Sequence, residues 1–177
     1  MALSFAALEA GLAQLPPPAA DNGSVALVVV RPGVDRRETP DCVRLTVESG
    51  LEGDRWSLRS GPDPQNQITL MRSDTARLIA DGQPLELFGD NLIVELDLSE
   101  SNLPAGTRIR IGTALCEVTP LPHTGCSKFR ARFGGDALEF VNGPAYKALR
   151  LRGIHVRVIE PGEVSTGDAA TVVSRPT

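Results

Sequence analysis

Apolar residues recur along the chain mainly in short runs with the spacing of β-strands. Residues Val25–Val30 are continuously apolar, and in Val43–Val47 the residues Val43, Leu45 and Val47 share one face. Similar runs predict strands at 67–71, 92–96, 107–111, 114–118, 154–159 and 167–173. Glycine and proline lie between most of these runs, so we expect about seven or eight short strands joined by turns.

Helical spacing is confined to a few segments. The first has Ser4 as an N-cap, an apolar face, and a triple proline at 16–18 that ends the helix. Its apolar face consists of Phe5, Leu8, Leu12 and Leu15. Further short helices are predicted at 73–80, 136–142 and 144–149.

Many strands with few helices between them favour a barrel over an alternating βαβ sheet. The predicted fold is mainly β, a closed or nearly closed β-barrel with three or four short flanking helices. We expect an N-terminal helix and proline linker over residues 1–21 and a barrel domain over residues 22–177.

Composition narrows the class of protein. The chain has 177 residues, 41% of them hydrophobic and 23% charged, as in an ordinary soluble domain. A net charge of −4 disfavours general nucleic-acid binding, and no apolar run approaches the length of a membrane span. Met1–Leu15 lacks the basic start of a secretion signal, and the three cysteines form no disulfide framework. We therefore expect a cytoplasmic protein without nucleic-acid or membrane partners.

Positive charge is concentrated in one part of the chain. Residues 1–127 carry ten arginines against seventeen acids, whereas residues 128–157 carry seven basic residues against two acids. This basic island consists of Lys128, Arg130, Arg132, Lys147, Arg150, Arg152 and Arg157. Clustered arginines suit a compact anion such as a phosphate. The alternative is a solvated surface whose charges pair with acids from elsewhere in the fold.

The basic island begins beside Cys126, which lies in the run Pro122–Arg130. Nearby positive charge favours the thiolate, the form that acts as a nucleophile or a soft metal ligand. Gly125 gives the backbone room, and His123 is placed to take the thiol proton. Alternatively, Cys126 is a small buried apolar residue, as we expect for Cys116 within its strand. A zinc site formed by these two cysteines and His123 lacks an obvious fourth ligand.

The dipeptide Gly-Asp recurs in the chain, and polar residues gather near two of these pairs, at 53–54 and 89–90. Such pairs usually mark turns, because aspartate bonds to nearby backbone and glycine supplies positive φ. The neighbouring polar residues are Arg55, Gln65, Asn66, Gln67 and Asn91. Amides and an arginine in this arrangement suit a pocket for a polar heterocycle.

Seven motifs follow one another along the chain, namely Leu51–Arg55, Gln67–Leu70, Gly89–Leu92, Leu103–Arg108, the Cys126 loop, Leu151–Ile154 and Gly167–Asp168. Taken in order, they resemble the MOSC domain. That domain is the C-terminal module of molybdenum cofactor sulfurases and also occurs as free-standing bacterial proteins. The resemblance covers about residues 22–173 and rests on the order of the motifs rather than on any one of them.

The resemblance implies a molybdenum-cofactor function centred on Cys126. In this interpretation the cysteine either carries sulfur as a persulfide or ligates molybdenum, as in relatives that resemble the amidoxime-reducing enzymes. The cofactor-binding residues implied are Asp54, Arg55, Asn91, Lys128, Arg130, Arg150 and Arg152. We expect Cys126 and His123 to be the catalytic residues.

Two classes of function follow. The first is a reductase of N-hydroxylated compounds with a separate electron-transfer partner, or a sulfur acceptor served by a cysteine desulfurase. Pyridoxal phosphate is expected only in that desulfurase, because 177 residues leave no room for its domain and neither lysine has a recognisable Schiff-base context. The second class is a non-catalytic module that carries sulfur or binds a pterin or a protein partner, or an interaction domain that has lost the cofactor.

Overall fold

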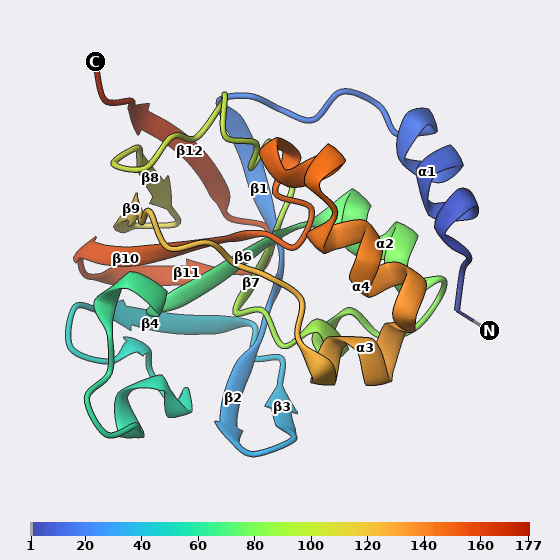
Figure 1. Cartoon of the computed structure of the whole chain (residues 1–177). Coiled ribbons are helices and arrows are strands. Elements are labelled where there is room, and N and C mark those ends of the chain that lie inside the picture. The colour runs from blue at the N-terminus through green and yellow to red at the C-terminus, as the bar shows by residue number, and fades with distance from the viewer. Residues whose placement is uncertain (1) are drawn as a thin grey trace.

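The fold is built on a closed barrel of seven strands (Figure 1). The computed structural model describes residues 2–177. Around the barrel the strands follow the order β1, β12, β8, β9, β10, β6 and β7, and β6 and β7 run parallel. Their bounds are Asn22–Val28 (β1), Ile68–Arg72 (β6), Leu92–Val94 (β7), Arg108–Ile111 (β8), Ala114–Val118 (β9), Ile154–Glu160 (β10) and Ala169–Ser174 (β12). The predicted mainly β, closed barrel is confirmed.

Two smaller sheets extend the barrel. One contains β4 (Cys42–Thr46), β5 (Gly50–Leu51) and β11 (Gly162–Ser165). The other is the hairpin of β2 (Val30–Gly33) and β3 (Arg36–Glu38), which projects from the barrel at the bottom of Figure 1. The hairpin was not predicted, because β3 is charged throughout and its pairing depends on backbone hydrogen bonds rather than on an apolar pattern.

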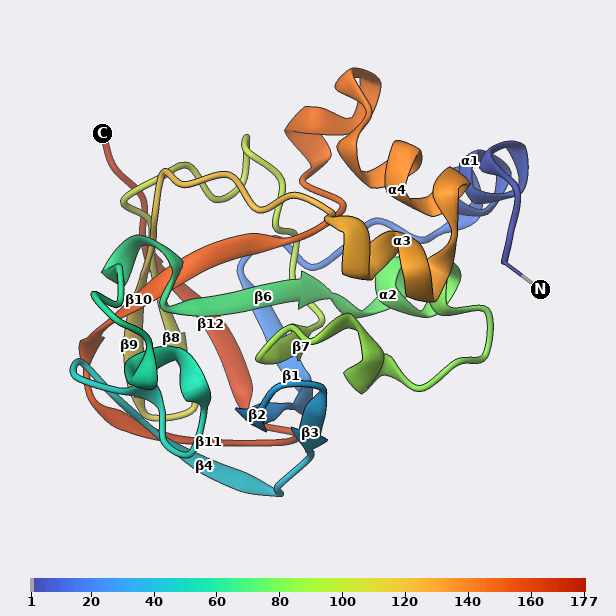
Figure 2. The ribbon, with the colours of Figure 1, turned by 60° about the horizontal axis from the view of Figure 1, so that its bottom comes forward.

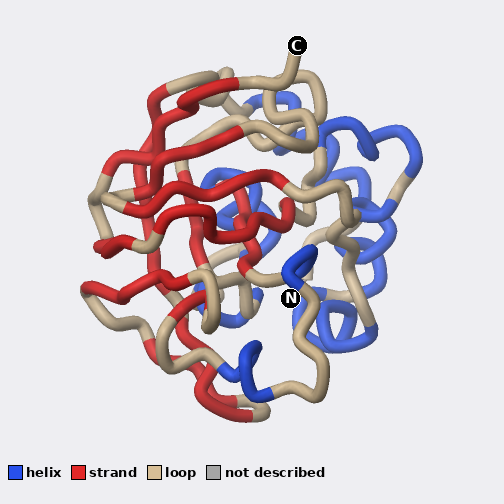
Figure 3. The backbone as a smooth tube through the Cα atoms, turned by 90° about the vertical axis from the view of Figure 1, so that its left-hand side faces the viewer, coloured by secondary structure: helices blue, strands red, loops and turns tan. Residues whose placement is uncertain are grey.

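Four α-helices gather at one end of the barrel (Figure 2), and Figure 3 shows most strands on one side of the molecule and most helices on the other. They are α1 (Phe5–Gln14), α2 (Ser73–Ala80), α3 (Ser127–Phe133) and α4 (Gly135–Asn142). Short 3₁₀ helices occur at Arg55–Leu58 (η1), Pro64–Asn66 (η2), Leu85–Phe88 (η3) and Pro144–Leu149 (η4). Within residues 2–177, no helix combines the length and apolar character needed to span a bilayer.

Helices α1, α2 and α4 agree with the predicted segments, whereas α3 was not predicted. Three charged residues interrupt α3, and only Phe129 and Phe133 mark its apolar face. A spacing of four residues in so short a segment is a weak helical signal. Helix α3 begins directly after Cys126, so the helix that was not predicted is the one next to the candidate reactive cysteine.

The molecule has two cores, one inside the barrel and one between the barrel and the helices. Leu70 and Leu92 point into the barrel core, whereas their neighbours Met71 and Ile93 belong to the helical core. All five phenylalanines of the chain lie in or against the helical core, namely Phe5, Phe88, Phe129, Phe133 and Phe140. Full burial of such a side chain contributes about 1.5–3 kcal/mol. The helical core therefore fixes α3 against the barrel.

Gly153 allows the chain that follows η4 to pass close to the backbone of strand β6 in the barrel. Its φ is +102°, and a Cβ there would lie 2.0 Å from the backbone oxygen of Leu70. The residue lies between Arg152 and strand β10, so its backbone also sets where that arginine emerges.

We predict that Gly153→Ala lowers the free energy of unfolding by about 2–5 kcal/mol, because positive φ and steric overlap add. Gly61→Ala is the matched control, since Gly61 also has a positive φ, of +63°, but no atom lies within 4 Å of the position that its Cβ would take. Gly61→Ala should lower the free energy of unfolding by no more than about 1–2 kcal/mol. Urea denaturation measures both, and equal losses would contradict the steric argument.

Candidate functional site

Cys126 is an exposed thiol at the residue before α3. The alternative that it is a buried apolar residue is therefore wrong. That description applies to Cys116, which is fully buried in the barrel core and whose pKa is raised by burial to about 12. Cys116 and Cys126 thus have opposite environments, and among residues 2–177 no three metal-ligating side chains gather as a zinc site requires.

Helix α4 fixes the loop that carries Cys126. The Gly125 backbone N–H donates to Oδ1 of Asn142 at 2.8 Å, and Nδ2 of Asn142 donates to the Gly125 oxygen at 3.1 Å. A Cβ at Gly125 would lie 2.7 Å from the end of the Leu138 side chain, so a larger residue would require Leu138 to shift. The loop is thus held against α4 by two hydrogen bonds to a single side chain.

Cys126 opens into a cavity of about 150 Å³, and half of the residues that line it are cationic. Segments far apart in sequence meet here, including the β2–β3 hairpin, η1 and α3. The cationic residues are Arg31, Arg36, Arg37, Arg55, Lys128, Arg132 and Arg152. Asp35 is the one acidic residue in this lining, and its carboxylate lies 3.8 Å from Lys128 and 3.4 Å from Arg132. A concave surface with this excess of positive charge attracts anions.

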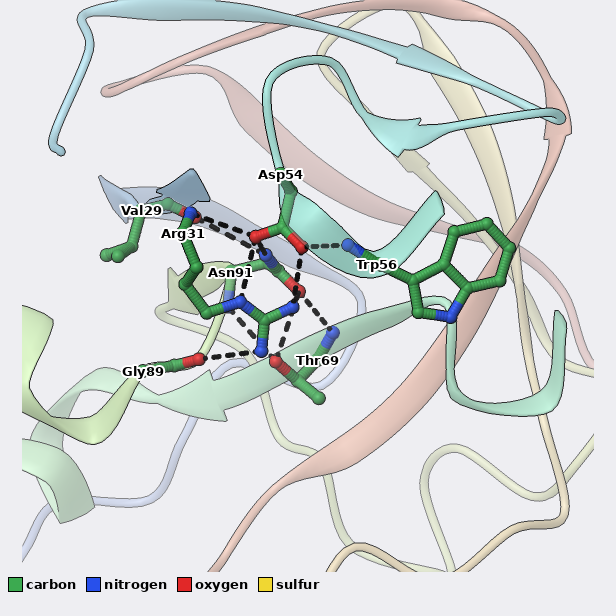
Figure 4. Close-up of polar contacts among 7 residues, drawn as sticks. All are labelled: Val29, Arg31, Asp54, Trp56, Thr69, Gly89 and Asn91. Atoms are coloured by element: carbon green, nitrogen blue, oxygen red, sulfur yellow. Dashed lines mark hydrogen bonds and ion pairs between the residues drawn. The ribbon is translucent and has the colours of Figure 1, made fainter. Parts of the chain in front are cut away.

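Arg31 is held from behind by a buried network (Figure 4). Its Nε and Nη2 donate to the two carboxylate oxygens of Asp54 at 2.8 and 3.1 Å. Nη2 also donates to Oδ1 of Asn91 at 3.0 Å, and Nδ2 of Asn91 donates to Asp54 at 3.1 Å. Asp54 and Asn91 were predicted to contact a cofactor. The structure places both beneath Arg31, where they orient a cavity-lining cation.

Asp54 also positions Arg55. Its Oδ1 accepts a hydrogen bond from the Trp56 backbone N–H at 2.9 Å and so caps η1, while the Trp56 ring is buried. Burial alone raises the pKa of Asp54, but hydrogen bonds and charge from Arg31 outweigh it, so the pKa lies below the ordinary value of 3.8. The Asp54 carboxylate is therefore ionised in the folded protein at neutral pH.

A second buried carboxylate, Asp90, holds Arg152. The two side chains form a buried ion pair, and the Arg152 guanidinium lies 5.3 Å from the ring centroid of Phe129 in α3. Nδ1 of His123 lies 3.6 Å from Oδ1 of Asp90. Burial and the nearby Arg152 charge hold the pKa of His123 well below its usual range, so this contact joins a neutral ring to a carboxylate. His123 is thus a neutral group within the cavity lining.

His155 has a structural environment. It lies in β10, its Nδ1 is 3.1 Å from the Leu121 oxygen, and its ring centroid is 4.6 Å from that of His123. Burial lowers the pKa of His155. The ring thus supports the loop that carries His123.

Buried polar atoms without partners gather around the same cavity. Of the seven such side-chain atoms within residues 2–177, five belong to this region. They are Nε of Arg37, Arg55 and Arg152, Nδ1 of His123 and Oδ1 of Asp90. An unsatisfied buried donor costs about 1–3 kcal/mol, so three guanidinium donors around one cavity fit a ligand that carries acceptor atoms.

The site lowers the pKa of Cys126. Partial burial by itself raises this pKa, but the backbone N–H groups of Phe129 and Lys128 and the charges of Arg152 and Arg132 together lower it below 9.0. The N–H groups act through the field at the start of α3, since they form no capping hydrogen bond with the sulfur. The thiol is therefore both exposed and shifted toward its reactive form.

The remaining predicted cofactor-binding residues divide into two groups. Arg55, Lys128 and Arg152 line the cationic cavity. Arg130 is exposed outside that lining, and Arg150 donates to the Leu103 oxygen at 2.7 Å and lines a different cavity.

Arg31, Arg36 and Arg37, which belong to the acidic part of the chain, were not predicted as site residues, and neither was Asp90. Arg132 was predicted only as part of the basic island. The signal that could have found Arg31 is its place directly after a buried strand and before Pro32-Gly33, where a turn exposes side chains.

Comparison with known proteins identifies the family. Residues 64–171 match the MOSC domain, and the chain belongs to this family. A comparison with curated proteins finds no matching sequence.

Solved structures of similar proteins support the same fold. A crystal structure described as a hypothetical protein is 29% identical, with a TM-score of 0.63 over 88% of this chain and 70% of that chain. YiiM from Escherichia coli is 26% identical, with a TM-score of 0.58 over 87% of this chain and 71% of its own. The YUAD protein from Bacillus subtilis is 20% identical, with a TM-score of 0.58 over 88% and 97%, and shows likeness of fold.

We predict that Asp54→Asn lowers the free energy of unfolding at neutral pH by about 1–3 kcal/mol. Because the folded-state pKa of Asp54 is depressed, its contribution is present above the ordinary value of 3.8 and is lost as the pH falls through the folded value. The difference between wild type and variant should therefore shrink below pH 3.8 in urea titrations. The control Asp35→Asn, at an exposed position, changes stability by less than about 1 kcal/mol. If the difference in unfolding free energy between wild type and Asp54→Asn did not change with pH, this role of the Asp54 carboxylate would be contradicted.

Alkylation of Cys126 should follow a thiolate titration with a midpoint below pH 9.0. A Cys42→Ser background removes the other exposed thiol, while buried Cys116 stays unlabelled in the folded protein. Mass spectrometry after iodoacetamide treatment across a pH series gives the midpoint. Arg132→Gln removes one of the charges that favour the thiolate, so this substitution should raise the midpoint of the titration. A midpoint at or above pH 9.0 would be incompatible with the activated thiol.

Proposed function

We propose that this protein binds the molybdenum cofactor in the cationic cavity, with Cys126 as a ligand of molybdenum, and reduces N-hydroxylated compounds. One observation carries the proposal: an exposed thiol of lowered pKa opens into a cavity with seven cationic side chains. Membership of the MOSC family supports it, because this family is associated with the cofactor.

The residues around the cavity fit the chemical groups of this cofactor. A pterin phosphate needs several donors, and Arg37, Arg55 and Arg152 each have an otherwise unpartnered buried Nε in this region. A thiolate is a soft ligand suited to molybdenum, and Cys126 is the exposed cysteine at this position. When bound, the cofactor supplies two-electron redox chemistry.

The chain itself supplies positive charge around the cavity and a thiol of lowered pKa. The charges of Arg152 and Arg132, together with the backbone N–H groups of Phe129 and Lys128, lower the pKa of Cys126 and so favour the thiolate that would coordinate the metal. The His123 ring stays neutral at the cavity wall, because burial and the Arg152 charge hold its pKa well below the usual range, and its Nδ1 lies 3.6 Å from Oδ1 of Asp90. Electrons come from a separate redox protein.

The exposure of Cys126 also favours a second function, that of a sulfur carrier. In that case the thiolate attacks the outer sulfur of a persulfide on a cysteine desulfurase. A sulfur–sulfur bond forms at Cys126, and the partner's cysteine leaves as a thiolate, so the step is balanced without an outside oxidant. The cations that favour the Cys126 thiolate also favour the resulting perthiolate anion.

Metal analysis of protein from molybdenum-replete cells distinguishes the two functions. The proposal predicts stoichiometric molybdenum that is lost on Cys126→Ala. Intact-mass detection of a Cys126 persulfide after incubation with a desulfurase, in protein free of molybdenum, would instead establish the carrier function. If neither signal is found, both functions are excluded.

A matched pair of arginine variants tests the cavity in the same experiment. Arg55→Gln removes a donor from the lining and should lower molybdenum content severalfold, because a charge-assisted hydrogen bond contributes about 1.5–3 kcal/mol. Arg130→Gln changes an exposed arginine outside the lining and leaves the content unchanged. If the two substitutions changed the molybdenum content equally, the proposal that the cofactor binds in the cationic cavity would be wrong.

A further inference from the structure

A second cavity, of about 240 Å³, borders the loop that carries Cys126. It is lined by residues of segment 119–124, the end of α4, η4 and the start of β10. His123 lines both this cavity and the cationic one, so the loop forms part of the wall of each. The volume lies just below the roughly 300–1,000 Å³ typical of sites for drug-sized molecules, so a ligand here would be small.

The lining combines an apolar surface with a small excess of positive charge. Leu121, Val141 and Ile154 supply the apolar surface. Lys147, Arg150 and Glu100 supply the charges, and the cations outnumber the acid. Within residues 2–177, neither cation has a carboxylate within ion-pair distance. The charge of Glu100 nevertheless acts on Arg150, and Nη1 of Arg150 already donates to the Leu103 oxygen, so Lys147 is the cation most available to an anion.

The backbone that presents Arg150 is strained. Arg150 has φ +50° and ψ +50°, the left-handed conformation that costs a non-glycine residue about 1–2 kcal/mol. It ends η4, and its side chain is anchored by the bond from Nη1 to the Leu103 oxygen. Strain of this kind persists where surrounding contacts impose it, and it is frequent at ligand sites.

We propose that this second cavity binds a small organic carboxylate. The apolar body of the ligand lies against Leu121, Val141 and Ile154, and its charge is received by Lys147 and Arg150. This site is distinct from the cationic cavity and does not depend on the molybdenum cofactor.

Occupancy of the second cavity is transmitted to Cys126 through Asn142. Asn142 lines the cavity and makes both hydrogen bonds to Gly125, the residue next to the cysteine. His123 and Thr124 of the same loop also line the cavity. A ligand that contacts these residues therefore alters the accessibility of the sulfur.

The first test is a titration of ¹⁵N-labelled protein with benzoate and with benzamide, its uncharged counterpart of similar shape. Excess inorganic phosphate is present to occupy the cationic cavity. Benzoate should shift the amide resonances of residues 123–125, Val141 and Asn142 with an affinity at least about fivefold above that of benzamide. Equal affinities, or shifts confined to residues of the cationic cavity, would overturn the proposal.

A pair of lysine variants provides the control for the assignment. Lys147→Gln changes an exposed lining residue and should weaken benzoate binding about threefold to tenfold without affecting benzamide. Lys128→Gln changes the other cavity and should leave the benzoate affinity unchanged. The opposite result, with Lys128 sensitive and Lys147 insensitive, would place the anion in the cationic cavity and refute the second site.

The second test measures coupling to Cys126. Saturating benzoate should change the rate of Cys126 alkylation at a fixed pH at least about twofold, and Asn142→Ala should reduce this response when benzoate saturates the variant as well. An unchanged rate in wild type would disprove the coupling even if binding is observed. Failure of molybdenum to bind would leave this result intact, so the two proposals fail separately.

Discussion

The charge balance of the cationic cavity is the constraint on which the site depends. Seven cationic side chains line one cavity of about 150 Å³, and their mutual repulsion opposes the folded state. Two buried carboxylates, Asp54 and Asp90, each neutralise one arginine from behind the lining. The remaining positive charge faces the cavity. The buried pairs thus fix where Arg31 and Arg152 lie and leave an electrostatic surplus for an anion.

The two cores position the parts of this site. The barrel core carries the strands from which the β2–β3 hairpin and η1 extend, and the helical core holds α3 through Phe129 and Phe133. Because α3 begins directly after Cys126, packing of two aromatic side chains determines where the sulfur lies. The lowered pKa of the thiol then follows from its position near the first turn of α3 and the surrounding arginines.

The loop before Cys126 separates two environments of different character. On one side lies the strongly cationic cavity, and on the other lies a larger cavity with an apolar surface and few charges. His123 contributes to both, and Asn142 holds the loop at Gly125. The cavity proposed for the cofactor and the cavity proposed for a small, partly apolar ligand are thereby joined by a single short segment.

The strand and turn pattern of the sequence determined the barrel and most of the helices, because apolar periodicity and turn residues act locally. The family resemblance pointed to Arg55, Lys128 and Arg152, which line the cationic cavity, and equally to Arg130 and Arg150, which do not. Local sequence could not separate these arginines, since lining a cavity depends on contacts between distant segments. The tertiary structure alone decided that Arg31 and Arg37 join Cys126, because barrel closure and helix packing bring the hairpin and α3 together.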